Sequence, residues 1–334
     1  MTTQERTFQC IETNGIRLRA VVEGRGPLIV LVHGFPESWY SYRHQLAPLT
    51  AAGFRVAAID VRGYGGSDKP EPIEAYSMRR LTSDVAGVID ALSGGEPAVL
   101  IGHDWGAPIV WTTSLLHPAK IRAVIGMSVP YLGRPSRSPL ETFRYVYRER
   151  FFYQLYFQEP GLAERELEAD LPATIRKIYY AASADCPPAH RELMENRPSD
   201  AKLFDGAIDP QPLPAWLTQD DVTYYAEQFR QGGFRGPLNR YRNIDSDWRA
   251  LSELQGARIT QPALFIAGER DPVLRFIPGR DMVTMMDDFY TDLRAKVIVP
   301  NAGHWVQQEQ PDAVNAAILA FLERLGDVPL TAST

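Results

Sequence analysis

Cysteine is scarce in this chain: only Cys10 and Cys186 occur among its 334 residues. Two cysteines cannot supply a disulfide framework or the full ligand set of a zinc site. A low cysteine content also fits a reducing compartment. Because no motif for a metal or a cofactor is found either, we expect the protein to use neither.

Long apolar runs are also absent. A membrane-spanning helix needs about 18 consecutive apolar residues, and no run in this chain approaches that length. The first residues, MTTQERTFQC, are polar and lack the apolar stretch of a signal peptide. We therefore expect a soluble cytoplasmic protein with no segment inserted in a membrane.

Positive charge is not in excess, since 35 Lys and Arg face 41 Asp and Glu and leave a net charge of -6. A nucleic-acid partner usually requires a basic face, and an anionic membrane attracts a polybasic segment. Apolar residues make up 45% and charged residues 23% of the chain, which is ordinary for a globular protein. The composition thus argues against a nucleic-acid partner and offers no polybasic anchor for a membrane.

Strand-like and helix-like segments alternate in the first part of the chain. Four short runs have the continuous apolar character of strands buried on both faces: Pro27–Val32, Arg55–Asp60, Ala98–His103 and Ala123–Val129. Helical patterns lie between them at Tyr42–Ala52, Met78–Leu92 and Ala107–His117. This alternation predicts an α/β fold, with a mostly parallel sheet and helices on both faces.

The pattern changes after Pro130. Between residues 135 and 245 no buried-strand run occurs, and aromatic and charged residues recur at helical spacing, as in Thr142–Gly161 and Asp221–Gly233. The alternation then resumes with Ala263–Gly268, Lys296–Gly303 and a helix from Pro311 to about Leu325. We therefore predict an α/β core formed by residues 1–134 and 246–334, an inserted helical cap at 135–245, and a loose tail, DVPLTAST.

The stretch GHDWGAP, Gly102 to Pro108, has the frame of a catalytic turn with an unexpected centre. In α/β-hydrolases the pattern G-x-S-x-G holds a nucleophilic serine on a sharp turn between a strand and a helix. Here the central residue is Asp104, and its neighbour His103 is interpreted as structural. A helix N-terminus favours an anion, so Asp104 is either a nucleophile or only a cap of the following helix.

Two later strands support the catalytic interpretation. Glu269 and Asp271 follow the strand Ala263–Gly268, and His304 follows the strand-like run at Lys296–Gly303. A nucleophile, an acid and a histidine at the carboxyl ends of strands match the chain order of α/β-hydrolase triads. We therefore predict a working triad with Asp104 in the serine position.

A carboxylate nucleophile implies a particular chemistry. It displaces a leaving group at an sp³ carbon and forms an alkyl ester, which water activated by the histidine then hydrolyses. The oxyanion of the second step needs N–H donors, which the backbone of Phe35 and Trp105 could supply. An epoxide and an alkyl halide are the two main candidate substrates.

An epoxide oxygen needs a proton donor, and tyrosine stays protonated at neutral pH, whereas a halide needs no proton. Most tyrosines of the insertion fit a role in packing, and physical chemistry alone does not select a catalytic pair. The candidates are Tyr145, Tyr147, Tyr153, Tyr156, Tyr179, Tyr180, Tyr224, Tyr225 and Tyr241.

Over nearly its whole length the chain resembles epoxide hydrolases of the α/β-hydrolase superfamily, both bacterial members and the hydrolase domain of the mammalian soluble enzyme. The stretches that carry this resemblance are HGFPESWYSYRHQ, DVRGYGGSDKP, GHDWGAPIVW, YQLYFQEPG, GFRGPLNRYRN, GERDPV and GHWVQQEQP. The resemblance implies that Asp104 is the nucleophile, Asp271 the acid and His304 the base. It further implies that Tyr153 and Tyr241 polarise the epoxide oxygen.

The same resemblance implies further features of the site. The oxyanion donors would be the backbone N–H groups of Phe35 and Trp105, and a cis peptide would precede Pro36. Trp105, Phe35, Pro36, Trp39 and Trp305 would shape the substrate pocket. The segment 170–214 has no family motif, although Ile175, Ile178 and Tyr179 are candidates for shaping the substrate site. By family analogy the protein would be a monomer or a homodimer.

Two alternatives are weighed against this interpretation. Haloalkane dehalogenases share the aspartate turn but usually carry asparagine where this chain has Phe35, and fluoroacetate dehalogenases usually carry arginine in place of Trp105. A non-catalytic binding protein on the same fold would be free to lose the acid or the base, yet Asp104, Asp271 and His304 are all present. Fold alone does not decide among these alternatives.

Overall fold

The structure is a computed structural model that describes residues 6–277 and 279–326. The predicted loose tail, residues 327–334, lies outside the described residues.

A single mixed sheet of eight strands forms the centre of the described structure, in the order β1-β2-β4-β3-β5-β6-β7-β8. Strand β2 is antiparallel to both of its neighbours, and β3 to β8 run parallel to one another. This arrangement confirms the predicted α/β class with a mostly parallel sheet. The strands are β1 Phe8–Thr13, β2 Ile16–Glu23, β3 Leu28–Val32, β4 Arg55–Ile59, β5 Ala98–His103, β6 Ile121–Met127, β7 Ala263–Gly268 and β8 Leu293–Val299.

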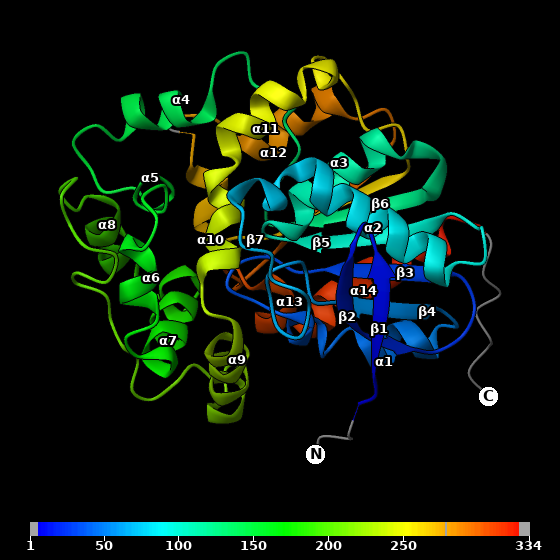
Figure 1. Ribbon diagram of the computed structural model, residues 1–334, viewed down its shortest axis with the longest axis horizontal. Coiled ribbons are helices and arrows are strands. Elements are labelled where there is room, and N and C mark those ends of the chain that lie inside the picture. The colour runs from blue at the N-terminus through cyan, green and yellow to red at the C-terminus, as the bar shows by residue number, and fades with distance from the viewer. Residues whose placement is uncertain (1–5, 278, 327–334) are drawn as a thin grey trace.

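Helices cover both faces of the sheet (Figure 1). Helices α2 (Met78–Leu92) and α3 (Gly106–Leu116) pack on one face, and α1 (Leu46–Ala51) and α14 (Pro311–Glu323) on the other. Successive residues of a strand point to opposite faces. Strand β3 is therefore apolar at every position, because alternate residues contribute to two different hydrophobic clusters.

Eight α-helices, α4 to α11, lie between β6 and β7, and we refer to them as the cap helices. They gather beside the sheet and its covering helices (Figure 1). Their bounds are α4 Pro139–Val146, α5 Tyr153–Tyr156, α6 Leu162–Leu167, α7 Leu171–Ala182, α8 Pro188–Glu195, α9 Gln219–Gly232, α10 Arg235–Arg242 and α11 Ile244–Ala250. The domain boundaries expected at 134/135 and 245/246 stay predictions. Helix α11 crosses the second of them, so the last cap helix continues beyond residue 245.

Short helices connect the larger elements and carry several site residues. They are η1 Trp39–Tyr42, η2 Ile73–Tyr76, η3 Pro118–Lys120, η4 Ser252–Leu254, η5 Pro272–Arg275, α12 Met282–Met285, η6 Met286–Phe289 and α13 Val306–Glu309.

Three local features differ from the sequence-based expectation. The hairpin of β1 and β2 was not expected, because the edge strand β1 buries only two of its six residues and so lacks an apolar run. The predicted helix Tyr42–Ala52 is divided between η1 and α1. The helical pattern at Thr142–Gly161 is likewise broken into α4 and α5, with a non-helical segment between them.

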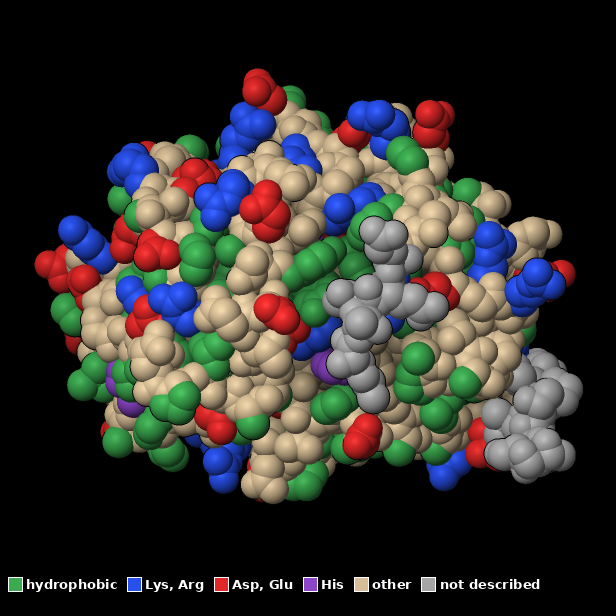
Figure 2. Space-filling view, turned by 90° about the horizontal axis from the view of Figure 1, so that it is seen from below, with side chains coloured by type: hydrophobic (Ala, Val, Ile, Leu, Met, Phe, Trp, Pro, Cys, Tyr) green, Lys and Arg blue, Asp and Glu red, His purple; other side chains and the backbone are tan. Residues whose placement is uncertain are grey.

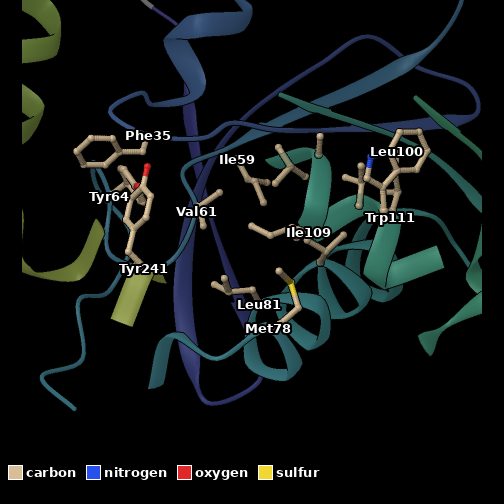
Figure 3. Packing of buried hydrophobic residues seen from close by; sticks show 14 of the residues in the cluster. Phe35, Ile59, Val61, Tyr64, Met78, Leu81, Leu100, Ile109, Trp111 and Tyr241 are labelled. Atoms are coloured by element: carbon tan, nitrogen blue, oxygen red, sulfur yellow. The ribbon is translucent and has the colours of Figure 1, made fainter. Parts of the chain in front are cut away.

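One hydrophobic cluster extends from the sheet to the cap (Figure 3). It runs from Trp111 and Leu100 in the core to Phe35 and Tyr241, which lie together at its far end. The packing of the sheet and the position of the cap are thus parts of one buried surface.

The molecular surface shows no segregation of charge on the face seen in Figure 2, where Lys and Arg are interspersed with Asp and Glu. In the described part of the chain, no helix has the length and apolar character required to cross a membrane.

Gly126 on β6 is a sensitive point of the core. A Cβ atom there would lie 2.0 Å from the ring of Trp111, which is only 1% exposed. We predict that Gly126→Ala lowers the free energy of unfolding by about 1–3 kcal/mol through overpacking, as measured by urea denaturation. In a Trp111→Phe background the smaller ring should reduce this cost. Additive effects in that double-mutant cycle would contradict the proposed clash.

Candidate active site

Asp104 occupies a sharp turn between β5 and α3. Its φ angle of 49° lies in the left-handed region, which is uncommon for a residue with a side chain. The flanking glycines permit this turn: a Cβ on Gly102 would lie 2.2 Å from the carbonyl oxygen of Gly106, and one on Gly106 would lie 1.9 Å from that of Val32. The local sequence therefore places a carboxylate at the carboxyl end of a central strand.

The carboxylate of Asp104 does not cap the helix that follows it. The first turn of α3 has no side-chain cap. Instead, Oδ1 accepts a hydrogen bond of 2.7 Å from the backbone N–H of Phe35, across the turn. The alternative that Asp104 is only a helix cap is therefore wrong.

The loop after β3 approaches this turn closely. A Cβ on Gly34 would lie 2.3 Å from Asp104 Oδ1 and 2.6 Å from the backbone nitrogen of Trp105. The peptide between Phe35 and Pro36 is cis, as the resemblance implied. The two expected oxyanion donors, Phe35 and Trp105, thus come from segments that meet beside the carboxylate.

His304 and Asp271 lie next to Asp104. The Nε2 atom of His304 is 3.4 Å from Asp104 Oδ2, and its Nδ1 atom is 3.2 Å from Asp271 Oδ1. Asp271 and His304 are 1% and 5% exposed, whereas Glu269, the other acidic residue after β7, is exposed. Of the two acidic candidates, the structure thus brings Asp271 into contact with the histidine.

Ser128, just after β6, was not identified from the sequence. Its hydroxyl donates a hydrogen bond of 2.5 Å to Asp271 Oδ2 and lies 2.8 Å from His304 Nδ1. Its φ angle of 72° is also in the left-handed region. A serine after a strand is too common to stand out in a sequence, and only the neighbouring strands bring it to the triad.

The charges at the site shift two pKa values in opposite directions. Burial lowers the pKa of His304, but the carboxylates of Asp271 and Asp104 outweigh this effect and raise it well above its ordinary value. Burial raises the pKa of Asp271, but His304 and the hydrogen bonds from Ser128 and Val273 outweigh burial and lower it. With Asp104 ionised, His304 therefore favours the protonated form.

A second buried histidine–carboxylate pair, His103 and Glu37, contacts the backbone of the site. His103 Nδ1 is 2.9 Å from Glu37 Oε2, and its Nε2 is 2.7 Å from the carbonyl oxygen of His304. Glu37 also accepts a hydrogen bond from the backbone N–H of Gly34. Although burial opposes it, His103 lowers the pKa of Glu37 to about 2. His103 is thus structural, as expected, but it contacts the backbone of the proposed base.

A cavity of about 480 Å³ opens in front of Asp104 and His304, between the sheet and the cap helices. Its wall is mainly apolar and rich in aromatic side chains, as expected for a site that binds an apolar molecule. The aromatic lining residues are Phe35, Tyr147, Phe151, Phe152, Tyr153, Phe157, Phe204, Tyr241, Phe276 and Trp305.

Three of the nine candidate tyrosines line this cavity: Tyr147, Tyr153 and Tyr241. The rings of Tyr153 on α5 and Tyr241 on α10 are 5.9 Å apart. Tyr241 is buried and Tyr153 is partly buried, and both contact other aromatic rings. Burial, and with it the charge of Asp104, raises the pKa of both tyrosines. Both hydroxyls therefore stay protonated and can act as donors.

Tyr241 is held by the residues around it. Its ring lies 5.2 Å from that of Trp105 and 5.4 Å from that of Phe35, in edge-to-face contacts. The guanidinium of Arg240 lies 4.9 Å from the centre of the Trp105 ring and forms a buried ion pair with Asp247. Arg240 therefore packs over the face of the Trp105 ring, a contact that the sequence pattern did not reveal.

The predicted pocket residues divide into two groups. Phe35 and Trp305 line the cavity, whereas Trp105, Pro36 and Trp39 are not among the described residues that line it. The indole N–H of Trp39 donates to the hydroxyl of Tyr224 on α9, so this side chain lies in the seam between core and cap.

The backbone carbonyl of Pro36 accepts a hydrogen bond from the hydroxyl of Tyr179. Of the three candidates in segment 170–214, only Ile178 lines the cavity, while Ile175 and Tyr179 are fully buried.

Comparison with known proteins agrees with this geometry. The family model described as alpha/beta hydrolase fold matches residues 27–311. The chain is 44% identical over 323 residues to the Mycobacterium tuberculosis protein named Epoxide hydrolase A, covering 96% of this chain and 98% of that protein. It is 39% identical to the pig protein named Bifunctional epoxide hydrolase 2, covering 96% of this chain and 55% of the pig protein.

Solved structures give the same result. An epoxide hydrolase from an endophytic Streptomyces superposes with a TM-score of 0.91 at 42% identity, with 96% of each chain covered. Epoxide Hydrolase A from Mycobacterium thermoresistibile superposes with a TM-score of 0.88 at 45% identity, covering 98% of this chain and all of that one. The chain therefore belongs to the α/β-hydrolase family and, within it, to the epoxide hydrolases.

The charge coupling at the site is testable by titration. We predict that Asp104→Asn lowers the pKa of His304, because one of the two carboxylates that raise it is removed. Imidazole NMR signals followed as a function of pH would report this shift. Asp312→Asn, an exposed change at the start of α14, should leave the pKa of His304 unaltered. A His304 that titrates identically in Asp104→Asn would contradict the coupling.

Proposed function

We propose that the protein converts an epoxide and water into a vicinal diol through a covalent ester on Asp104. The observation that carries this proposal is the juxtaposition at one cavity of a carboxylate on a sharp strand-to-helix turn, a histidine paired with a buried acid, and two tyrosines from the cap. The names of the similar proteins support the same activity.

In the first step, we assign the attack to Asp104 Oδ2, because Phe35 N–H holds Oδ1. The new bond joins Oδ2 to an epoxide carbon, and the bond between that carbon and the epoxide oxygen breaks. The electron pair stays on the oxygen, where hydrogen bonds from Tyr153 and Tyr241 stabilise the charge. Two preorganised donors in a buried site suit an alkoxide better than a halide, which needs no proton.

In the second step, His304 removes a proton from a water molecule that attacks the Cγ carbon of the ester. The bond between Cγ and Oδ2 then breaks. Oδ2 leaves with the remaining proton of the water as one diol hydroxyl, and the water oxygen completes the restored Asp104 carboxylate. The alkoxide of the first step takes up the proton that His304 gives up once the ester has formed, so both diol oxygens are protonated and His304 ends in its starting state. Formation of the ester removes the negative charge of Asp104, so the pKa of His304 falls and the imidazole is released to act as a base. The first step thereby prepares the second.

The oxyanion of the second step forms on Asp104 Oδ1. Phe35 N–H already donates to this atom at 2.7 Å, and Trp105 N–H is the proposed second donor. Because these groups are fixed by the backbone, they need no rearrangement as charge develops; one such donor contributes a factor of about 10²–10³ in rate. A small-molecule epoxide is the proposed substrate, while cytoplasmic location and a monomeric or homodimeric state stay predictions.

The covalent step has a direct test. We predict that His304→Gln still opens the epoxide but hydrolyses the ester about 10²–10⁴-fold more slowly, because the general base is lost. The peptide containing Asp104 should then carry the added mass of the substrate. Adding Asp104→Asn to this variant should abolish the adduct. An inactive His304→Gln that binds epoxide without forming an adduct would exclude the proposed mechanism.

The two tyrosines can be tested through the rate of ring opening. Each donates to developing negative charge, and a hydrogen bond to a charged group contributes about 1.5–3 kcal/mol. We predict that Tyr153→Phe and Tyr241→Phe each slow single-turnover ring opening by about 10–100-fold. The double variant should show no measurable ring opening.

Tyr156→Phe is a matched control, because Tyr156 lies on the same helix but its hydroxyl donates to Glu166. Full activity of the double variant would refute the tyrosine assignment. Release of halide from a haloalkane, without diol formation from an epoxide, would favour dehalogenation instead.

A further inference from the structure

We propose that Glu309 is a positioning residue that fixes the loop of the base His304, jointly with the end of the cap helix α7, for the second step of the reaction. The inference rests on the proposed function, since it assumes that His304 activates the hydrolytic water. It also assigns a role to part of the segment 170–214, for which the sequence shows no motif.

Glu309, at the end of α13, binds the residues on both sides of His304. Its Oε2 atom accepts a hydrogen bond of 2.8 Å from the backbone N–H of Gly303, and its Oε1 atom accepts one of 3.0 Å from that of Trp305. The same Oε2 accepts a third bond, of 2.8 Å, from the N–H of Ala184, just beyond α7. One carboxylate therefore joins the base loop to the cap.

Only an ionised carboxylate satisfies all three donors in this arrangement. Glu309 is 8% exposed, so water does not readily replace a lost partner. A carboxylate accepts hydrogen bonds on both of its oxygens. A protonated acid carries an O–H donor on one oxygen, and an amide carries an NH2 donor in place of one oxygen. In Glu309→Gln, the side-chain NH2 group would therefore point at one or more of these backbone N–H groups, and two donors would face each other.

The cap also contacts the base loop directly. The backbone N–H of His304 donates a hydrogen bond of 2.9 Å to the carbonyl oxygen of Ala182, the last residue of α7. The indole N–H of Trp305 donates a hydrogen bond of 2.8 Å to the carbonyl oxygen of Tyr179. The rings of these two residues are stacked, with their centres 4.3 Å apart. A Cβ on Gly303 would lie 2.5 Å from the backbone nitrogen of Ala184. The loop and α7 are thus in close contact over three consecutive residues.

The charges around Glu309 determine the pH at which its role has to be tested. Burial raises the pKa of Glu309 to about 7 against the effect of its three donors, and the charge of Asp271 adds to the rise. Two cations lie near. Arg270, from the loop after β7, donates to the carbonyl of Ala184, and Arg191 on α8 donates to that of Ser183. Measurements at a pH of about 9 keep Glu309 ionised in the wild-type protein.

The two steps of the reaction depend on this loop to different degrees. Ring opening requires Asp104 and the tyrosines, none of which Glu309 contacts. Hydrolysis requires His304 Nε2 to be aimed at a water beside the ester, and a misplacement of about 1 Å in such a geometry costs about 10²-fold in rate. Loss of the Glu309 contacts should therefore affect the second step selectively.

The test is steady-state and single-turnover kinetics of Glu309→Gln on an aryl epoxide. We expect kcat and KM to fall by the same factor, about 10–100-fold, while kcat/KM, which reports ring opening, stays unchanged. The ester on Asp104 should accumulate and be visible by mass. Glu309→Asp, which keeps the charge on a shorter side chain, should restore part of kcat.

Asp84→Asn is a matched control for the loss of a buried carboxylate. Asp84 on α2 is 2% exposed and pairs with Arg62, away from the cavity lining. This change should lower stability without separating kcat from kcat/KM. A Glu309→Gln variant that loses kcat/KM and kcat equally, as a globally weakened protein would, overturns the positioning role.

A measurement on the wild-type protein avoids dependence on a variant that fails to fold. The amides of Gly303, Trp305 and Ala184 should exchange with solvent at matching slow rates, because one carboxylate holds all three. Rapid exchange of any of them contradicts the proposal.

Failure of the inference is distinguishable from failure of the proposed function. If His304→Gln accumulates the ester and Glu309→Gln has wild-type kcat and KM, only the role of Glu309 is refuted. If neither variant forms an ester, the covalent mechanism is refuted as well.

Discussion

The turn at Asp104 depends on the close approach of backbone segments, which leaves no room for a Cβ atom at the glycines around it. Gly102 and Gly106 lie within contact of each other and of β3, and Gly34 lies against the carboxylate itself. This close approach holds Asp104 in a left-handed conformation and directs its Oδ1 to the N–H of Phe35. The positions of the acid, the base and the cap tyrosines are all defined relative to this point.

Buried charge is the second feature that organises the site. Asp271 and Glu37 each lie within hydrogen-bonding reach of a histidine, and their remaining oxygens accept from backbone or side-chain donors. Buried charges that are paired and hydrogen-bonded hold the groups around them in place, whereas an unpaired charge there is costly. Such rigidity suits catalysis by preorganised donors, since little reorganisation accompanies the development of charge.

The cap contributes to the site in more than one way. Through α5 and α10 it supplies the two tyrosines, and through α7 it contacts the loop of His304. Next to α7, the cap helix α9 is joined to η1 by hydrogen bonds of its tyrosine hydroxyls, such as that of Tyr224 with Trp39. The cap helices are therefore a wall of the cavity and also a support for core residues.

The sequence by itself determined the parts that depend on local patterns. The continuous apolar runs predicted the central strands, and the spacing of glycines around Asp104 predicted the turn, because backbone geometry there tolerates few residue types. The resemblance predicted the cis peptide before Pro36, which the structure contains. The edge hairpin of β1 and β2 was missed, since half-exposed strands leave little apolar signal.

The chain order predicted that Asp104, Asp271 and His304 converge, but only the tertiary structure decided which further side chains contact them. Ser128 and Glu309 are ordinary residues in the sequence. The contact of Ser128 with Asp271 and that of Glu309 with Ala184 join elements far apart in the chain. Trp39 was expected to shape the pocket, but its indole N–H finds a partner on α9 and lies in the seam instead. Hydrogen-bond partners of buried groups are set by the packing of distant segments, and local sequence patterns carry no record of that packing.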